Sequence, residues 1–382
     1  MVFIPSWLIK NPQAASFAVA DEPLCVDIID PEAIYQAVKD KGVKGIVSMA
    51  EAGVVSAAIV SERLGLQGVT ASAAVNATSK ANMRRAWETM PEYSVGYHIV
   101  HTLEEAENAA KALNTLPLIC KPDKTFGGSR GVSKIESLDQ VKEAFDFAFA
   151  SGMNGKVIIE ECATGEEYSC EVLAYHGKTS VLCKGRKVKS PMPFRVDLSV
   201  QYGQHLTEAQ DAAIADMCHK AVAALGIVSG VAHIEFALTT AGPKIFELGA
   251  RCGGGHTPII AKHVSGVNEF VEYCRLACGD KPESFNPLQN KGADYRFVIF
   301  PAGRLASVSI PQDLYKHKNI LDIVVTATAG DTINTLRTTS DRAGAIVTIA
   351  DSMDEAITAA DEACRRIEVT YEDGSHTNAI VM

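Results

Sequence analysis

Two glutamates in the middle of the chain have the spacing of a cation site. The stretch GVAHIEFAL (230–238) alternates like a strand, and PKIFELGAR (243–251) returns after a Thr-Ala-Gly turn. In a hairpin centred on Ala241, Glu235 and Glu247 lie directly opposite each other. Cross-strand neighbours are about 5 Å apart and like charges there repel, so the pair indicates a cation between the carboxylates, and hard oxygen ligands favour Mg²⁺. A register shifted by one or two residues would instead separate them.

Two further side chains are expected on the same side of this hairpin. His233 shares its face with Glu235, and we expect it to be an outer hydrogen-bond partner, because Mg²⁺ prefers oxygen ligands. Arg251 stands four residues beyond Glu247 and leads into the turn Cys252-Gly253-Gly254-Gly255-His256. The spacing predicts a flexible turn with an arginine aimed at the same region.

A phosphate cradle is expected at LICKPDKTFGGSRGV (118–132). Its apolar start is short enough for a buried strand, and Lys121 stands where that strand would end. Three glycines in the five-residue tip let backbone amides point inward together, with Gly127 and Gly128 next to the hydroxyl of Ser129. Such a loop binds anions, and the lysine would neutralise phosphate charge. The alternative is a glycine-rich hairpin tip beside a solvated lysine.

A basic helix and an acidic segment flank this cradle in the sequence. KANMRRAW (80–87) predicts a helix start with Lys80 and Arg84 on one face, either solvated or placed to meet phosphate. Downstream, two strands are expected around a Thr164-Gly165 turn, with a solvated hairpin as the alternative. They carry four acidic residues, which are Glu160, Glu161, Glu167 and Glu171.

The hydrophobic pattern elsewhere predicts mixed α/β structure. Strand–helix alternation near the start indicates a parallel α/β layer, with strands at 26–30 and 44–50 and helices from Pro31 and Val54. A capping box at Thr207 begins another helix. Further expected elements are a helix at 268–278, strands at 295–303, 344–350 and 367–371, and a helix between the last two strands.

The composition is that of an ordinary globular protein. The 382 residues are 47% hydrophobic and 21% charged, which suits two or three domains. The net charge of −10 argues against nucleic acid as a partner. Ten scattered cysteines indicate reduced thiols, and the start MVFIPSWLIKNP is too short for a membrane span and carries no leader. We therefore expect a cytoplasmic protein that binds neither nucleic acid nor membrane.

In this order the pieces resemble the ATP-grasp superfamily, in particular its carboxylate–amine (L-amino-acid) ligases. The likeness runs from about Asp21 to Tyr371 and rests on the lysine helix, the KP-x4-GGSRGV loop, the EE-x5-E segment, the H-x-E strand and the E-x3-R-x-GGG turn. It implies the ATP-grasp fold in a multidomain α/β and α+β protein. The implied parts are a pre-ATP-grasp domain at 1–77 that lacks the first strand and helix, an ATP-grasp domain at 78–290 with a lid at about 115–175, and an α+β part at 291–382 that completes the site.

The resemblance implies a set of nucleotide contacts. Lys80 and Lys121 would hold the α- and β-phosphates of ATP. The loop at Gly127, Gly128 and Ser129 would close over the β- and γ-phosphates. The residues implied at adenine and ribose are Glu160, Glu161, Cys162, Ala163 and Glu167.

It also implies a metal and substrate site. Glu235 and Glu247 would bind Mg²⁺, which Mn²⁺ could replace, and Arg251 would lie near the acyl acceptor. Further implied substrate contacts are His233, Gly254 and His256, and the implied catalytic groups are Arg251, Lys121 and Ser129.

Two departures from the family pattern stand out. The family usually has an asparagine two residues after the second metal glutamate, and here that position is Gly249. This leaves open whether one or two metal ions bind. The family also begins with a strand, a glycine-bearing turn and a helix, whereas this chain is expected to start at the second strand.

The implied reaction is ATP-dependent amide formation between two small molecules, expected to be amino acids. The γ-phosphoryl group would pass to a carboxylate, an amine would attack the acyl phosphate, and ADP and phosphate would leave. A homodimer is expected. Two alternatives stay open: an ATP-grasp carboxylase or carbamoyl-phosphate-type enzyme that uses bicarbonate, and a nucleotide-binding regulatory module without chemistry. The acid, the amine and the role of the loop at 185–205 are not set by the sequence.

Overall fold

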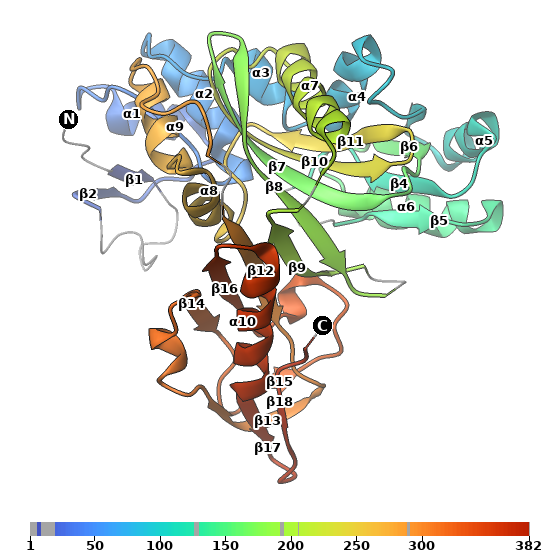
Figure 1. Ribbon diagram of the computed structural model, residues 1–382. Helices are drawn as coiled ribbons and strands as arrows, with labels where there is room; N and C mark the ends of the chain where they lie inside the picture. The colour runs from blue at the N-terminus through green and yellow to red at the C-terminus, as the bar shows by residue number, and fades with distance from the viewer. Residues whose placement is uncertain are drawn as a thin grey trace.

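An antiparallel sheet of eight strands runs through the molecule and carries the two predicted metal-binding glutamates (Figure 1). This computed structural model describes residues 6–8, 20–125, 130–191, 195–204, 206–288 and 291–381. In spatial order the strands are β11 (Gly242–Gly249), β10 (Gly230–Thr239), β7 (Glu166–Tyr175), β8 (Lys178–Lys189), β9 (Asp197–Tyr202), β12 (Gly292–Val298), β16 (Gly344–Ala350) and β14 (Ile320–Val325). Because β9 pairs with β12, one sheet joins the middle of the chain to its C-terminal part.

A second, four-stranded sheet holds the start of the expected phosphate cradle. Its order is β3 (Tyr97–Val100), β6 (Val157–Glu161), β4 (Leu118–Pro122) and β5 (Ser133–Ile135). Helices α5 (Leu103–Leu113) and α6 (Val141–Ser151) pack on it through a shared apolar core. Lys121 is the second-last residue of β4 and so lies at the end of the strand, as predicted. Gly127, Gly128 and Ser129 lie outside the described residues.

The two acidic strands, expected on either side of a Thr164-Gly165 turn, belong to different sheets. β6 ends at Glu161 in the small sheet, and β7 begins at Glu166 in the large one. The connector crosses close to β10, since a Cβ on Gly165 would come within 2.3 Å of the Leu238 carbonyl oxygen. The alternative of a solvated hairpin is therefore wrong: each strand pairs within its own sheet, and the connector joins the two sheets.

The N-terminal part departs from the prediction in its strands. β1 (Ser6–Leu8) pairs in parallel with β2 (Glu22–Leu24), so a strand precedes β2. The ranges 26–30 and 44–50 are fully described and neither forms a strand. Near Gly45 the chain passes the end of α9, where a Cβ would come within 2.7 Å of the Ala277 backbone. The apolar pattern there reflects burial against a helix rather than strand pairing.

The expected helices of this part are present. They are α1 (Pro31–Val38), α2 (Val54–Arg63) and α4 (Lys80–Ala86), and a further helix that was not predicted, α3 (Ala71–Asn76), lies between the last two. The side chain of Asp30 caps α1 and that of Ser79 caps α4. The helix that brings Lys80 to the site therefore begins where the sequence indicates.

Helices pack on both faces of the large sheet, and α9 packs on the face that also carries the charged residues. The remaining helices are α7 (Glu208–Ala224), α8 (Thr257–Ser265), α9 (Glu269–Ala277) and α10 (Met353–Arg366). The predicted capping box of Thr207 and Gln210 begins α7, which packs on Cys170 and Ile234. Because neighbouring residues of a strand face opposite ways, Glu171 and Glu235 point to the other side of the sheet.

The C-terminal part combines the end of the large sheet with a small sheet of four strands. That sheet has the order β15 (Thr332–Ile333), β13 (Gly303–Ser309), β17 (Glu368–Tyr371) and β18 (His376–Asn378). β16 and α10 match the ranges expected from the sequence, whereas β12 begins earlier than expected. Short 3₁₀ helices span Glu51–Gly53, Trp87–Thr89, Leu138–Gln140, Leu314–Lys316 and Thr339–Asp341.

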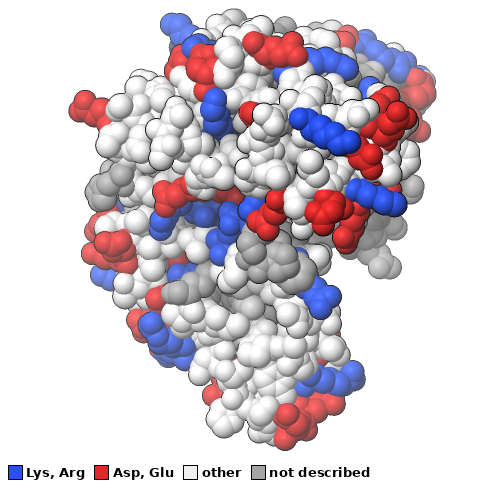
Figure 2. All heavy atoms as spheres, turned by 90° about the vertical axis from the view of Figure 1, so that its right-hand side faces the viewer, with Lys and Arg blue, Asp and Glu red and all other residues white. Residues whose placement is uncertain are grey.

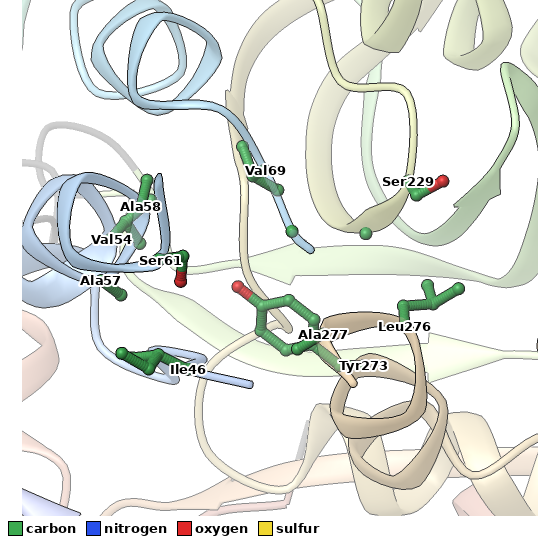
Figure 3. Close-up of a pocket in the computed structure, with 12 residues that line it drawn as sticks. Ile46, Val54, Ala57, Ala58, Ser61, Val69, Ser229, Tyr273, Leu276 and Ala277 are labelled. Atoms are coloured by element: carbon green, nitrogen blue, oxygen red, sulfur yellow. The ribbon is translucent and has the colours of Figure 1, made fainter. Parts of the chain in front are cut away.

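The seam between the N-terminal helices and α9 is closed. Figure 3 shows Tyr273 of α9 with Ile46, Val54, Ser61 and Ala277 around a cavity of about 10 Å³. A cavity of this size holds at most one water molecule. The seam is therefore a packing contact rather than a substrate site. Within the described ranges, no helix has both the length and the apolar character needed to cross a bilayer.

Candidate active site

The β10–β11 hairpin pairs Glu235 directly with Glu247, as predicted, but for a different reason. The turn is the two-residue Thr240-Ala241, and counting from it alone would place Phe246 opposite Glu235. A β-bulge next to Glu235 inserts one residue into β11 and restores the pairing of the two carboxylates. The bulge is thus the local feature that brings the two acidic groups together.

Two lysines neutralise this pair of carboxylates. Lys80 of α4 lies 2.9 Å from Glu247 (Nζ–Oε2), and Lys187 of β8 lies 2.6 Å from Glu235 (Nζ–Oε2). The charge of Lys80 lowers the pKa of Glu247. Burial would raise the pKa of Glu235, but Lys187 and His233 hold it well below its usual value. Both carboxylates are therefore ionised, and their side chains keep 28% and 37% of their surface exposed.

His233 links the carboxylate pair to the glycine turn through Glu171. Its Nδ1 lies 2.6 Å from a Glu171 oxygen and its Nε2 lies 3.3 Å from Glu235. The other oxygen of Glu171 accepts a hydrogen bond from the Gly253 amide at 2.8 Å. Burial would lower the pKa of His233, but Glu171 and Glu235 raise it to about 9. His233 is thus a cation at neutral pH that sits behind Glu235.

This raised pKa makes stability depend on pH. A folded pKa of about 9 against an unfolded value of 6.5 stabilises the protein fully below pH 6.5, and this stabilisation is lost as pH rises through 9. We expect His233→Gln to remove roughly 2–3 kcal/mol of unfolding free energy at pH 6 and almost none at pH 10. Urea unfolding with EDTA measures this. A difference between the two proteins that is constant with pH would contradict it.

Arg251 is held by the N-terminal part of the chain. Its Nε donates to Glu51 at 2.7 Å, and its Nη1 donates to the Cys252 carbonyl at 2.8 Å. A Cβ on Gly249 would come within 3.1 Å of the same Glu51 oxygen. The Arg251–Glu51 pair therefore occupies the space in which a larger side chain at position 249 would lie, which accounts for the glycine there.

Lys121 lies in a buried cluster behind the two carboxylates. Its Nζ is 2.6 Å from Glu160, and Arg84 holds the same carboxylate with two nitrogens, Nε at 2.7 Å and Nη2 at 3.0 Å. Burial alone would raise the pKa of Glu160, yet Arg84 and Lys121 lower it to about 2. Burial also lowers the pKa of Lys121 to about 8. Both oxygens of Glu160 are engaged, so it lies behind Lys121 rather than against adenine or ribose.

We expect Lys121→Met to weaken ATP binding about 10- to 100-fold at pH 7, because a charge-assisted contact is lost. Arg84 remains on Glu160, so the fold should persist. Since the pKa of Lys121 is about 8, wild-type affinity should fall toward that of the variant between pH 7 and 9, while the variant stays flat. Calorimetric titration measures both, with Lys142→Met on exposed α6 as the control. Equal affinity of wild type and variant at pH 7 would exclude Lys121 from the site.

The other nucleotide residues predicted from the sequence line the connector between the sheets. The Glu161 side chain accepts from the Gly96 amide at 2.8 Å, and the Cys162 amide donates to the Pro117 carbonyl at 3.1 Å. Ala163 follows in the same connector. Glu167, at the start of β7, pairs with Lys189 and with Arg195, each at 2.8 Å. These residues lie where the connector joins the small sheet to the large one.

The two remaining predicted substrate residues lie beyond Arg251. Gly254 is exposed, and a Cβ there would meet nothing within 4 Å. His256 Nε2 lies 2.9 Å from Asp322, and its ring stands edge-on to Tyr295 with centroids 5.5 Å apart. His256 therefore connects the glycine turn to the C-terminal part of the molecule.

The donor set fits a hard cation held by few protein ligands. Among the described residues, no group of three His, Cys, Asp or Glu side chains could hold a metal ion. Glu235 and Glu247 supply two facing carboxylates, and Mg²⁺ commonly uses one or two carboxylates with phosphates and water as its other ligands. The pair therefore suits a metal that arrives with a phosphate compound, rather than a fully enclosed structural ion.

Sequence reasoning missed four residues that complete this arrangement: Lys187, Glu171 as the partner of His233, Glu51 and Arg84 as the partner of Glu160. The basic run CKGRKVK on β8 was the available signal for Lys187, because Lys187 and Lys189 share one face of a strand that neighbours the acidic β7. The partners of Arg251 and Glu160 lie 200 and 76 residues away in sequence. No local pattern could pair them.

The fold is that of an ATP-grasp protein. A family model described as an ATP-grasp domain matches residues 114–258, and one described as L-amino acid ligase C-terminal domain 2 matches residues 296–372. The crystal structure of L-amino acid ligase from Bacillus licheniformis superposes with a TM-score of 0.80 at 22% identity, covering 92% of this chain and 88% of that one. The predicted fold class is thus confirmed.

Curated relatives agree with this class. D-alanine–D-alanine ligase from Flavobacterium psychrophilum is 31% identical over 154 residues, which are 38% of this chain and 45% of that one. Dapdiamide A synthase from Enterobacter agglomerans is 24% identical over 236 residues, 56% of this chain and 53% of that one. The chain spans about half the length of these two relatives. The chain therefore carries an ATP-grasp domain and a match to L-amino acid ligase C-terminal domain 2, in agreement with the predicted resemblance to ATP-grasp ligases.

Proposed function

We propose that this protein joins the carboxylate of one amino acid to the amine of another at the expense of ATP. The observation that carries the proposal is the facing pair of ionised carboxylates, Glu235 and Glu247, with Lys80 and Lys187 against them and Arg251 nearby. A protein that only senses a nucleotide needs no such concentration of charge around two facing acids.

The first step would move the γ-phosphoryl group to the substrate carboxylate, giving an acyl phosphate and ADP. A divalent ion, with Mg²⁺ favoured and Mn²⁺ as a substitute, would offset charge on the phosphate oxygens when bound between Glu235 and Glu247. With those glutamates engaged, Lys80 and Lys187 are free to turn to phosphate oxygens. Arg251, whose pKa is raised by Glu51 despite burial, stays charged and can meet the carboxylate or its phosphorylated form bidentately.

The second step would join the amine to the acyl carbon, with phosphate as the leaving group. The acyl phosphate must be kept from water until the amine arrives. We assign this task to the loop at Gly127, Gly128 and Ser129. Further proposed nucleotide contacts are Lys121, Glu161, Cys162, Ala163 and Glu167, and further proposed substrate contacts are His233, Gly254 and His256.

We also propose the division into parts at 1–77, 78–290 and 291–382, a homodimeric assembly and a cytoplasmic location. Support for the location comes from the ten cysteines, which all lie among the described residues and none of which is in a disulfide.

The reaction is tested by isotope transfer. Acid substrate carrying ¹⁸O in its carboxylate is turned over with ATP, and the products are analysed by mass spectrometry. We expect one labelled oxygen to reach inorganic phosphate, because the acyl phosphate gives up the oxygen that bridged carbon and phosphorus. Label on AMP would indicate an adenylate instead. Turnover that depends on bicarbonate alone would favour a carboxylase, and binding of ATP without turnover of any acid would favour a regulatory module.

A further inference from the structure

Arg342 has a carboxylate-binding edge without a partner. It lies directly before β16 in the C-terminal part, and its guanidinium stacks on Phe297 with 3.6 Å between Cζ and the ring centroid. Its Nε and Nη2 are shielded from solvent, and neither has a hydrogen-bond partner. Burial lowers the pKa of Arg342 even though Asp197 acts to raise it. Burying a guanidinium without a hydrogen-bond acceptor lowers the folding stability of the protein. The stack on Phe297 therefore holds Arg342 in place at a cost in stability that a bound acceptor would offset.

Two other buried arginines of this chain show what that edge binds. Arg84 holds Glu160 through its Nε and Nη2, at 2.7 and 3.0 Å. Arg296 holds Asp294 through the same two nitrogens, at 3.1 and 2.6 Å. At Arg342 the nearby carboxylate is Asp197, with Nη2 3.7 Å from Oδ2, which is too long for a hydrogen bond. The Nε–Nη2 edge that a carboxylate occupies in Arg84 and in Arg296 is therefore unoccupied in Arg342.

A chain of charged contacts connects Arg342 to the carboxylate pair. Asp197 pairs with Lys189 at 2.8 Å, directly across β8 and β9. Lys187, two residues earlier on the same strand, pairs with Glu235, and Asp197 helps to raise its pKa. Figure 2 shows lysine, arginine, aspartate and glutamate side chains gathered where the C-terminal part meets the rest of the molecule. Arg342 thus belongs to the charged face of the large sheet.

A ladder of rings leads to the same arginine from the glycine turn. His256 stands against Tyr295 with centroids 5.5 Å apart, and Tyr295 lies 4.6 Å from Phe297, on which Arg342 stacks. The ladder begins five residues after Arg251 and ends in the C-terminal part. Its rings offer an apolar wall, and the guanidinium at its end offers a charge. This combination suits an amino acid, which has an apolar body and a carboxylate.

We propose that Arg342 binds the carboxylate of the amine substrate and so selects a free amino acid as the acceptor. This rests on the proposed function, in which the acid substrate gives its own carboxylate to phosphorylation near Arg251. The second amino acid keeps its carboxylate, which must be neutralised away from the acyl phosphate. Stacking on Phe297 confines the partner to the plane of the guanidinium, which favours a planar carboxylate over a phosphate, and the acidic Asp197 and Glu167 nearby disfavour a dianion.

The test compares amino acids with their carboxamides as acceptors. Phosphate release is screened with all pairs of the twenty proteinogenic L-amino acids, and the best acid is then combined with each amino acid, or its carboxamide, as the amine. We expect wild-type kcat/KM to be about 10- to 100-fold higher for the best amino acid than for its carboxamide. Arg342→Gln should lower the amino-acid value to that of the carboxamide and leave the carboxamide value unchanged. Arg342→Lys should restore part of the preference, since it keeps the charge without the planar fork.

Two further variants separate binding from structure. Arg304→Gln removes an exposed arginine of the same part, paired with Glu372, and should change neither value. Asp197→Asn should keep the preference for the carboxylate. The proposal is overturned if Asp197→Asn reproduces Arg342→Gln, if Arg342→Gln lowers both values equally, or if it raises KM for the acid instead. Wild-type turnover without discrimination overturns this inference alone, whereas absence of wild-type turnover with every pair overturns the proposed function as well.

Discussion

Replacing Glu247 with glutamine should lower the rate of ADP formation by about 10²- to 10³-fold at millimolar Mg²⁺. The substitution keeps shape and hydrogen-bonding atoms but removes one of the two facing charges, so the pair no longer attracts a divalent ion strongly. Raising the metal concentration should recover part of the rate, because the remaining carboxylate of Glu235 still binds. The measurement is ADP release as a function of metal concentration, with Glu372→Gln in the exposed C-terminal part as the control.

The same variant should be almost as stable as the wild type in EDTA. Glu247 repels Glu235, but Lys80 and Lys187 already offset that repulsion, so its removal brings no large gain. The lost pair with Lys80 is partly exposed and contributes at most about 1 kcal/mol. Full turnover of Glu247→Gln at low metal would show that the pair is structural. Strong destabilisation in EDTA would lead to the same conclusion.

The residues that sequence could place are those whose neighbours are local. Alternation along β10 and β11 put Glu235 and Glu247 on one face, and the short turn limited their register. The capping residues of α4 and α7 fixed where these helices begin. Even here the pairing of Glu235 with Glu247 depends on a β-bulge that could not be predicted from the sequence. A correct prediction of facing carboxylates was reached by counting from the wrong turn centre.

The sequence could not predict ion-pair partners that are distant in the chain and that only the fold brings together. Lys187 reaches Glu235 from a strand that is not adjacent to β10, because β7 lies between them. Glu51 reaches Arg251 from the N-terminal part. The strands expected at 26–30 and 44–50 failed for a related reason: an apolar run records burial but does not say whether a ladder partner exists.

A buried acid under the glycine turn illustrates the same limit. Glu269 at the start of α9 is fully buried beside Glu171. Burial and the charge of Glu171 raise its pKa well above the usual range, which favours its neutral form. In the sequence it is indistinguishable from an ordinary acidic residue in the first turn of a helix. Its position next to Glu171 follows only from the packing of α9 against the large sheet.

Replacing Arg251 with lysine should lower kcat by about 10³-fold while ATP binding stays within a few-fold of wild type. Charge grows on the transferred phosphoryl group and the acyl oxygen in the transition state, and a guanidinium meets two such oxygens at once, whereas an ammonium meets them as a point charge. The expected signature is a loss in kcat rather than in affinity, measured by single-turnover ADP formation and by calorimetric titration of ATP.

The control for Arg251→Lys is Glu51→Gln, which leaves the guanidinium in place and removes the carboxylate that orients it. Because Arg251 also donates to the Cys252 carbonyl, its position should survive in part, and we expect a loss of about tenfold. The relative size of the two activity losses distinguishes a structural role of Arg251 from a role at the reacting oxygens. If Arg251 merely ties the N-terminal part to the glycine turn, both variants break the same ion pair and should lose activity and thermal stability to the same extent. If it acts on the reacting oxygens, the lysine variant loses far more activity than the glutamine variant at equal stability.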